Sequence, residues 1–510
     1  MFWLQKVVDD IEKAHPEGEI IVSSGVSPSG TYHVGTLREV LTTDALVVEL
    51  KKRGRSVRHL HFVDDHDQLR KIPVGIDSSY EKFLGKSLCD VPSPDGNGSY
   101  ADYFLKDFLS NLDILGIEME VIRSNEKYRS GFFETAIEKT LENINVVKEC
   151  LERVSGRKLN DQWSPIQVNE EGYLKKRPFV SIDTSKKTII FLNKEDKETE
   201  ISYVGGQVKL DWRLDWPARW WLVGVQAEPF GRDHATKGGS YDTGVELMKK
   251  VFGSSAPYPI PYAFINRTGE TKKMSKSAGN TVNVSELLSV LPPEIVRFFV
   301  LRFSPDKQLF FDQEGGIVRL IDEYAELLAK PNKDADDEQL ISVCSSPLKQ
   351  NTISNVPFSH LVASYQSALK DPEKTIEIIK RTEHADIADA QQETIKLELD
   401  YIDRWLEQWA PESVKFSLLE NVEPNEFTDA QKTFMFGLAD KIEHAPEDAD
   451  GQWFHQAIYD FKTDEVSPKE LFTVLYRCLI GKEAGPRAGW FLSILPRDWL
   501  IQRLRLKSSV

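Results

Sequence analysis

One stretch near the start of the 510-residue chain restricts the fold more than any other. An apolar run at residues 20–23 leads into a turn of glycine, serine and proline at 25–30, and a stripe with helical spacing follows from about 33 to 53. Gly54 ends this predicted helix, and residues 57–63 form a second buried strand. Strand, glycine-rich turn, helix and strand predict the βαβ unit of a Rossmann-type α/β fold, which presents phosphate groups to a helix N-terminus.

The residues at the start of that helix fit phosphate binding. Ser29 lies in the turn, and His33 falls in the first helical turn, where its side chain points back toward a bound phosphate. Gly35 lets a ligand approach the helix closely, because glycine has no Cβ.

A second candidate for phosphate binding is the basic loop Lys273-Met274-Ser275-Lys276-Ser277. Two lysines three apart in a loop of small residues can reach a polyphosphate, because each ammonium is a mobile point charge with three donors. Serine hydroxyls and free backbone N–H groups add further donors. The alternative is a solvated basic surface loop, which is the commoner use of such a segment.

Other patterns place polar residues at the ends of predicted strands. The apolar runs 222–225 and 262–265 are predicted strands, and a helix capped by Ser285 follows the basic loop. Residues 64–68 come directly after the strand at 57–63 and contain three acids and a histidine. Such a cluster can hold a metal, but beside an ATP-binding βαβ unit structural and hydrogen-bonding roles are more common.

Four tryptophans crowd residues 212–221 with helical spacing. Such a stripe is usually core packing. Asp211 and Asp215 alternate with the tryptophans, however, and a tryptophan face beside a carboxylate suits an alkyl-ammonium group. The residues alone leave core packing and pocket lining open.

Two further candidates follow shortly after this segment. Asp233 is a candidate to bind ribose hydroxyls, and His234 is a candidate for the wall of a pocket. The alternative is that Asp233 is a carboxylate that stabilises a turn and His234 is a surface histidine.

Together these features resemble the class I aminoacyl-tRNA synthetases, whose two ATP signatures are similar to His33-Val-Gly-Thr36 and to residues 273–277. The chain departs from the first signature at Thr36, where the family has histidine, so one imidazole contact to ATP is absent or replaced by a hydroxyl. The similarity spans nearly the whole chain. Within this class, the chain most resembles the class I lysyl-tRNA synthetases. The segments that carry this resemblance are residues 24–30, 209–220, 231–234, 238–244 and 475–487.

The resemblance implies a ligase that activates lysine with ATP, accompanied by Mg²⁺, and transfers it to the 3′ end of tRNA(Lys). It implies His33, Lys273 and Lys276 as catalytic residues, and adenylate formation that generally requires bound tRNA. The implied ATP-binding residues are Ser29, His33, Gly35, Thr36, Asp233, Lys273, Met274, Ser275, Lys276 and Ser277. The implied lysine-binding residues are Gly25, Ser27, Trp216, His234 and Tyr262.

The implied fold class is an α/β Rossmann-type catalytic domain with an inserted subdomain, followed by an all-α anticodon-binding domain. We place the catalytic domain at residues 1–285, its insertion at about 72–210, a connector at 286–345 and the helical domain at 346–510. A boundary is predicted near residues 330–357, which are charged and have little periodicity. The candidate tRNA contacts are basic residues near the C-terminus: Lys482, Arg487, Arg503 and Arg505.

Composition limits the partners and the compartment. Eighty acidic against 64 basic side chains give a net charge of −16, which argues against nucleic acid unless a local basic surface exists. The chain has no run of eighteen apolar residues and no signal-peptide pattern, and its four cysteines form no C-x-x-C pair. We therefore expect a cytoplasmic protein without membrane contact, without a metal site and without structural zinc.

Three alternatives share parts of this pattern. A nucleotidyl transferase that activates a small carboxylate without RNA has the same βαβ unit and both signatures, but it needs no helical domain. A non-catalytic tRNA-binding paralogue is disfavoured by the intact His33, Gly35, Lys273 and Lys276. Among synthetases, glutamate is the second candidate substrate.

Overall fold

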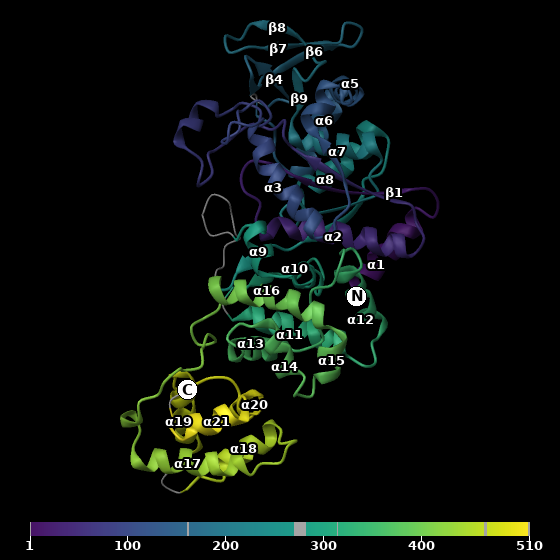
Figure 1. Ribbon diagram of the computed structural model, residues 1–510. Helices are drawn as coiled ribbons and strands as arrows, with labels where there is room; N and C mark the ends of the chain where they lie inside the picture. The colour runs from purple at the N-terminus through teal and green to yellow at the C-terminus, as the bar shows by residue number, and fades with distance from the viewer. Residues whose placement is uncertain (1, 161–162, 270–281, 314, 464–466, 508–510) are drawn as a thin grey trace. The chain divides into compact units, whose positions relative to one another are not determined.

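The computed structural model describes residues 2–160, 163–269, 282–313, 315–463 and 467–507 (Figure 1). The described chain forms two compact units. The first comprises the chain up to Leu288 together with Val296–Phe311 and Lys333–Lys349. The second comprises Ser289–Ile295, Asp312–Asn332 and the chain from Gln350 onward. The region predicted as a connector, 286–345, therefore contributes segments to both units, and the predicted domain limits stay a prediction.

A five-stranded parallel sheet forms the centre of the first unit, as the βαβ pattern predicts. Its order is β11-β10-β1-β2-β3. The strands are β1 (Ile20–Val26), β2 (Val57–Val63), β3 (Glu120–Arg123), β10 (Ala227–Gly231) and β11 (Tyr258–Tyr262). The order runs outward from β1 in both directions, so the strand order reverses between β1 and β10. In open α/β sheets this reversal opens a crevice for ligands at the carboxyl ends of the strands.

Helix α2 (Val34–Lys52) connects β1 to β2, and most of its residues are buried. Its Arg38 side chain is buried and donates to the carbonyls of Ser304 and Pro305 at 2.8 and 2.9 Å. The other helices that lie wholly in this unit are α1 (Phe2–Ala14), α3 (Tyr100–Ile114), α4 (Ser124–Arg129), α5 (Glu134–Glu142), α6 (Ile144–Ser155), α7 (Trp212–Val223), α8 (Ser240–Leu247) and α12 (Ala335–Ser345), with short helices η1 (Ser78–Phe83) and η2 (Met248–Phe252).

A small antiparallel subdomain is inserted between β3 and β10. One of its sheets contains β4 (Ile166–Glu170), β5 (Tyr173–Lys176) and β9 (Val208–Leu210), and the other β6 (Phe179–Asp183), β7 (Thr188–Leu192) and β8 (Glu198–Ser202). These strands gather at one end of the first unit, next to α5 (Figure 1). Buried side chains of the insertion such as Val168 and Phe191 share one apolar cluster with Leu214 and Trp220 of α7.

The second unit is helical, as predicted for the C-terminal part. It contains α11 (Gly316–Ala329), α13 (Phe358–Ser367), α14 (Pro372–Ile379), α15 (Ala385–Ala390), α16 (Gln392–Gln408), η3 (Pro424–Glu426), α17 (Asp429–Glu443), α18 (Gly451–Tyr459), α19 (Pro468–Ile480), α20 (Ala488–Ile494) and α21 (Arg497–Leu504). Trp405 is fully buried against Phe358, and capping boxes begin α17 and α19. No helix among the described residues is long and apolar enough to cross a membrane.

Two predicted strands are wrong in position. Residues 222–225 are not a strand, because α7 continues to Val223 and Gly224 ends it with a φ of 70°. The strand before Arg232 is instead β10, which begins at Ala227. Residues 262–265 do not form one strand, because Tyr262 ends β11 and Ile265 begins the short strand β12 (Ile265–Arg267), which pairs with β13 (Leu309–Phe311). The prolines of β11 obscured that strand. Among the described strands it pairs with β10 alone and lies at the sheet edge, where a missing N–H is tolerated.

Helix boundaries differ from the predictions at two places. Ser285 does not cap α9 (Val284–Val290); the side chain of Asn283 accepts from the N–H of Glu286 at 2.6 Å instead. The following helix is α10 (Pro293–Leu301). The weakly periodic stretch 330–357 contains α12, which begins with a capping box at Asp334.

Candidate active site

A cavity of about 570 Å³ lies at the carboxyl ends of the parallel strands in the first unit. Gly25 follows the middle of β1, and Phe230 and Gly231 end β10, so the cavity opens where the strand order reverses. The end of β2 and the first turns of α7 complete the wall. Fold topology and cavity therefore identify the same place as the ligand site.

The residues predicted to bind lysine come together in this cavity. Its lining includes Gly25, Ser27, Trp216, His234 and Tyr262. Asp233, the candidate for ribose hydroxyls, lines the same cavity. A Cβ on Gly231 would lie 2.6 Å from an oxygen of Asp233, so glycine is needed there for the carboxylate to take this position.

Glu39 is the main lining residue that the sequence analysis did not single out. It projects from α2 and accepts hydrogen bonds from the N–H of Gly25 and the hydroxyl of Tyr262, both at 2.7 Å. Burial raises the pKa of Glu39 to about 8, against the opposing effect of these two hydrogen bonds. Its position between two helix residues, Arg38 and Val40, gave no sequence signal because only the fold brings it to the end of β1.

The tryptophan stripe serves both the core and the cavity, which settles the alternative left open above. Trp216 lines the cavity, and its ring centroid lies 5.6 Å from that of His234. Trp220 is buried and packs so closely on α8 that a Cβ on Gly244 would lie 2.5 Å from its ring. The indole N–H groups of Trp216 and Trp220 both donate to Glu228 of β10. Burial raises the pKa of Glu228 to about 7.

A group of acidic residues after β2 and in α7 also lines the cavity. Asp64 and Asp67, which follow β2, line it together with Asp215 of α7. Arg219 pairs with both Asp64 and Asp215. Burial raises the pKa of Asp64 to about 6. Part of the cluster at 64–68 is structural, as predicted, because the buried Asp65 accepts from the N–H of Asn125 at 2.8 Å.

The glycine-rich turn places His33 as the N-cap of α2, one position before the predicted first turn. Its Nδ1 accepts from the N–H of Gly35 at 3.0 Å, so the proton of the neutral ring lies on Nε2, which can donate to a ligand. A Cβ on Gly35 would lie 2.7 Å from this ring. Position 35 therefore requires glycine because of the His33 ring. We had predicted instead that glycine lets a ligand approach the helix. Thr36 is half-buried and donates its N–H to the His33 carbonyl at 2.8 Å.

The basic loop Lys273–Ser277 lies outside the described residues. The described chain resumes at residue 282. Val282 accepts from the N–H of Val34 at 3.0 Å, Asn283 pairs with His33, and Val284 donates to the carbonyl of Tyr32 at 3.2 Å. Residues 282–284 therefore lie beside the start of α2. Ser29, the turn candidate, is half-buried, and its carbonyl accepts from the hydroxyl of Tyr100 at 3.4 Å.

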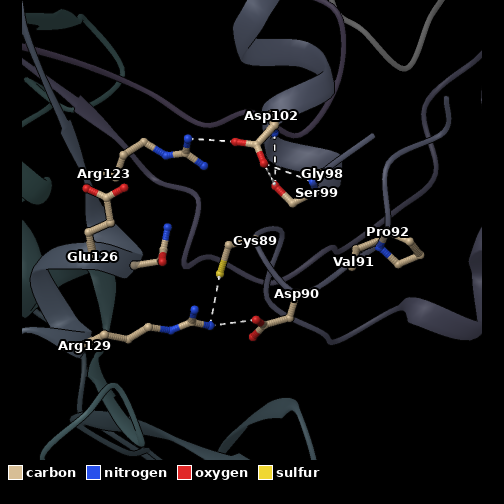
Figure 2. A pocket seen from close by; sticks show the side chains of 11 residues that line it. Cys89, Asp90, Val91, Pro92, Gly98, Ser99, Asp102, Arg123, Glu126 and Arg129 are labelled. Carbon is tan, nitrogen blue, oxygen red and sulfur yellow. Dashed lines mark hydrogen bonds and ion pairs between the residues drawn. The ribbon is translucent and has the colours of Figure 1, made fainter. Parts of the chain in front are cut away.

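A second cavity, of about 490 Å³, is formed between residues 89–102 and residues 123–129 (Figure 2). It is lined by polar residues that pair with one another. Arg123 pairs with Asp102 at 2.8 Å, and Arg129 pairs with Asp90 at 2.7 Å. Cys89 points toward Arg129 (Figure 2), and burial raises the pKa of its thiol to about 12.

The predicted tRNA contacts in the second unit are mostly engaged within the protein. The prediction for Arg503 is wrong as a surface contact, because its side chain is buried and donates to the carbonyls of Leu419 and Glu420. Arg505 pairs with two carboxylates at 2.7 and 2.6 Å. Lys482 is half-buried and donates to two backbone carbonyls. Arg487 is exposed.

No group of three or more histidine, cysteine or acidic side chains suited to a metal occurs in the described part of the chain. Cys150, Cys344 and Cys478 are buried, and all four cysteines are free thiols. That the protein holds no structural zinc stays a prediction.

The fold and this site define a Rossmann-type nucleotide-binding protein. Residues 1–345 match the family described as tRNA synthetases class I (K). The chain is 35% identical to lysine–tRNA ligase 1 of Methanosarcina acetivorans, covering 100% of this chain and 99% of that one. It is 33% identical to the lysine–tRNA ligases of Archaeoglobus fulgidus and Pyrococcus horikoshii, each alignment covering 99% of both chains. The chain belongs to the class I lysyl-tRNA synthetases.

Proposed function

We propose that the protein is a lysine–tRNA ligase that activates lysine with ATP and transfers the lysyl group to tRNA(Lys). One observation carries the proposal within the first unit: the cavity at the point of strand-order reversal combines an indole wall with carboxylates that come from several elements. Lysine needs this combination, because it presents two ammonium groups joined by an apolar chain.

The two acidic parts of the cavity would bind the two ammonium groups. Glu39, held by Gly25 and Tyr262, is placed beside the phosphate-binding turn and would receive one of them. The carboxylates of Asp64 and Asp67 after β2 would receive the other. Trp216 and His234 would cover the methylene chain between them, which removes apolar surface from water.

ATP would bind across the start of α2. Nε2–H of His33 would donate to a phosphate oxygen, and the exposed Asp233 would bind the ribose hydroxyls. Lys273 and Lys276 would stabilise the charge that develops on the phosphates, with Met274, Ser275 and Ser277 forming the rest of the loop. Mg²⁺ needs no protein cage for this role, because it is commonly held by substrate phosphates with few protein ligands, and it would add positive charge there.

The chemistry would proceed in two transfers. The lysine carboxylate attacks the α-phosphate, the bond to the bridging oxygen breaks, and pyrophosphate leaves. A hydroxyl at the tRNA 3′ end then attacks the lysyl carbonyl, and AMP leaves. Reactions of this kind depend on positioning and charge stabilisation more than on covalent catalysis. The helical second unit would supply the anticodon contacts, and the four free thiols agree with a cytoplasmic location.

Glutamate suits the cavity poorly. Among the described residues, six acidic side chains line it: Glu39, Asp64, Asp67, Asp215, Glu228 and Asp233. The described lining arginines are Arg70 and Arg219, and Arg219 is already paired with two of those acids. A substrate with a negative side chain would be repelled by the ionised members of this set, which disfavours its binding.

A test is aminoacylation of tRNA with lysine and with norleucine, which has the same chain length but no ε-ammonium. A site built to pair an ammonium group rejects such an analogue by about 10⁴-fold or more, because its own buried polar groups are left unpaired. Comparable kcat/KM values for the two amino acids would contradict the proposed use of the carboxylates.

A further inference from the structure

Five charged side chains form a continuous network in the wall of the cavity, and all but Lys209 line it. Asp215 stands at its centre, buried to 1% exposure, and pairs with Arg219 on one oxygen. Its other oxygen accepts from the hydroxyl of Tyr128 and lies 3.7 Å from Nζ of Lys209. Lys209 also lies 3.1 Å from Asp67, and Arg219 pairs with Asp64. The network thus runs Asp64, Arg219, Asp215, Lys209, Asp67.

The two ends of this network face the ligand site, whereas Lys209 does not. Asp64 and Asp67 line the cavity, with side chains 26% and 20% exposed. Lys209 comes from β9 of the insertion, its side chain has no exposed surface, and it is absent from the lining. Among the residues that the structure describes, its buried Nζ has no hydrogen-bond partner, so its charge is balanced by the nearby carboxylates.

The formal charges of the network do not cancel. Three carboxylates stand against two cations, which leaves one negative charge. Arg70 lies 3.8 Å from Asp67, but its side chain is 65% exposed, so solvent screens it. Because Asp64 and Asp67 are the accessible members, the uncompensated charge is presented to the cavity.

We propose that Lys209 is a positioning residue that sets the charge selectivity of the cavity. Its ammonium holds Asp67 and Asp215 in place and reduces the charge of the network to a single negative unit, which one ammonium group of the substrate then neutralises. This inference rests on the proposed function, because it takes the carboxylates after β2 to bind an ammonium group of lysine.

The network can be tested by altering its charge in steps. Asp67→Asn leaves two carboxylates and two cations, so the network has no net charge. Lys209→Met leaves three carboxylates and one cation, so the network has a net charge of −2. The double variant leaves two carboxylates and one cation, which restores the wild-type net charge of −1. Lys250→Met is the matched control, because Lys250 pairs with Glu149 at the surface, at 3.2 Å.

Aminoacylation at varied lysine concentration would give KM and kcat for each variant. We expect Asp67→Asn to raise KM for lysine by about tenfold or more, which is typical of truncating one partner of a partly buried charge pair, with kcat changed less. The double variant should have a lower KM than Asp67→Asn, although it carries one more substitution. Lys250→Met should match the wild type.

Two results would overturn the inference: an unchanged KM in Asp67→Asn, or a double variant no better than Asp67→Asn at binding lysine. Lys209→Met leaves a buried carboxylate without its cation and can fail to fold. In that case the KM of Asp67→Asn still tests whether the charge of the network acts on lysine binding, and an unchanged KM overturns the inference. Failure of the wild type to charge lysine would instead refute the proposed function.

Discussion

Substituting Gly35 by alanine should separate activity from stability. The new Cβ would lie 2.7 Å from Cε1 and 2.8 Å from Nδ1 of His33. Carbon atoms normally approach to about 3.5–4.0 Å, so the ring must move by about 1 Å. A displacement of this size at a reacting centre costs about 10²-fold in rate. Stability should change little, because alanine favours the helix by up to about 1 kcal/mol and the lost hydrogen bond costs about the same.

The measurement is ATP–pyrophosphate exchange with lysine and tRNA present, together with thermal unfolding. We expect kcat to fall about 10²-fold in Gly35→Ala while Tm moves by only a few degrees. In a His33→Ala background the ring is gone, so adding Gly35→Ala should cost no further activity. Equal losses from Gly35→Ala in both backgrounds, or full activity of the single variant, would refute the role of Gly35 in seating His33.

Three further outcomes are expected. Lys276→Ala should lower kcat by about 10²–10³-fold with little change in KM for lysine, as for loss of one preorganised donor, and an unchanged kcat would leave the loop without a catalytic role. Burial raises the pKa of Glu39 to about 8, so binding of cationic lysine should strengthen by up to about tenfold per pH unit from pH 6 to 8. Glu39→Gln should have a weaker dependence, which Asp64 and Glu228 with pKa values of about 6 and 7 retain, and an unchanged slope would assign it elsewhere. Arg487→Ala should weaken tRNA binding more than Arg505→Ala, because Arg505 is already paired; equal effects in a filter-binding titration against salt would argue against this difference.

The sequence predicted the parts of the fold that follow from local patterns. The strand–turn–helix–strand unit was predicted with correct boundaries at β2, because Gly54 and the apolar run at 57–63 are local signals. β11 was missed because its two prolines argue against a strand unless one knows that it lies at the sheet edge.

The site was predictable only where a family resemblance or a short pattern marked the residues. Gly25, Ser27, Trp216, His234 and Tyr262 line one cavity, although they are up to 237 residues apart. Glu39 and Lys209 could not be recognised, because their roles arise from contacts between distant segments. Arg503 is the opposite case, because its place in a basic tail predicted a surface contact to tRNA. Its side chain is instead buried and donates to two backbone carbonyls.

Comparison of tRNA charging with lysine and with glutamate is the most direct test of the proposed activity. Purified protein, ATP, Mg²⁺ and total tRNA would be incubated with each amino acid in turn, and acylated tRNA would be quantified. We expect lysine to be attached to tRNA and glutamate to be rejected, because six acidic side chains of the described residues line the cavity and Arg219 is already paired. Attachment of glutamate in preference to lysine would contradict the assignment of this cavity.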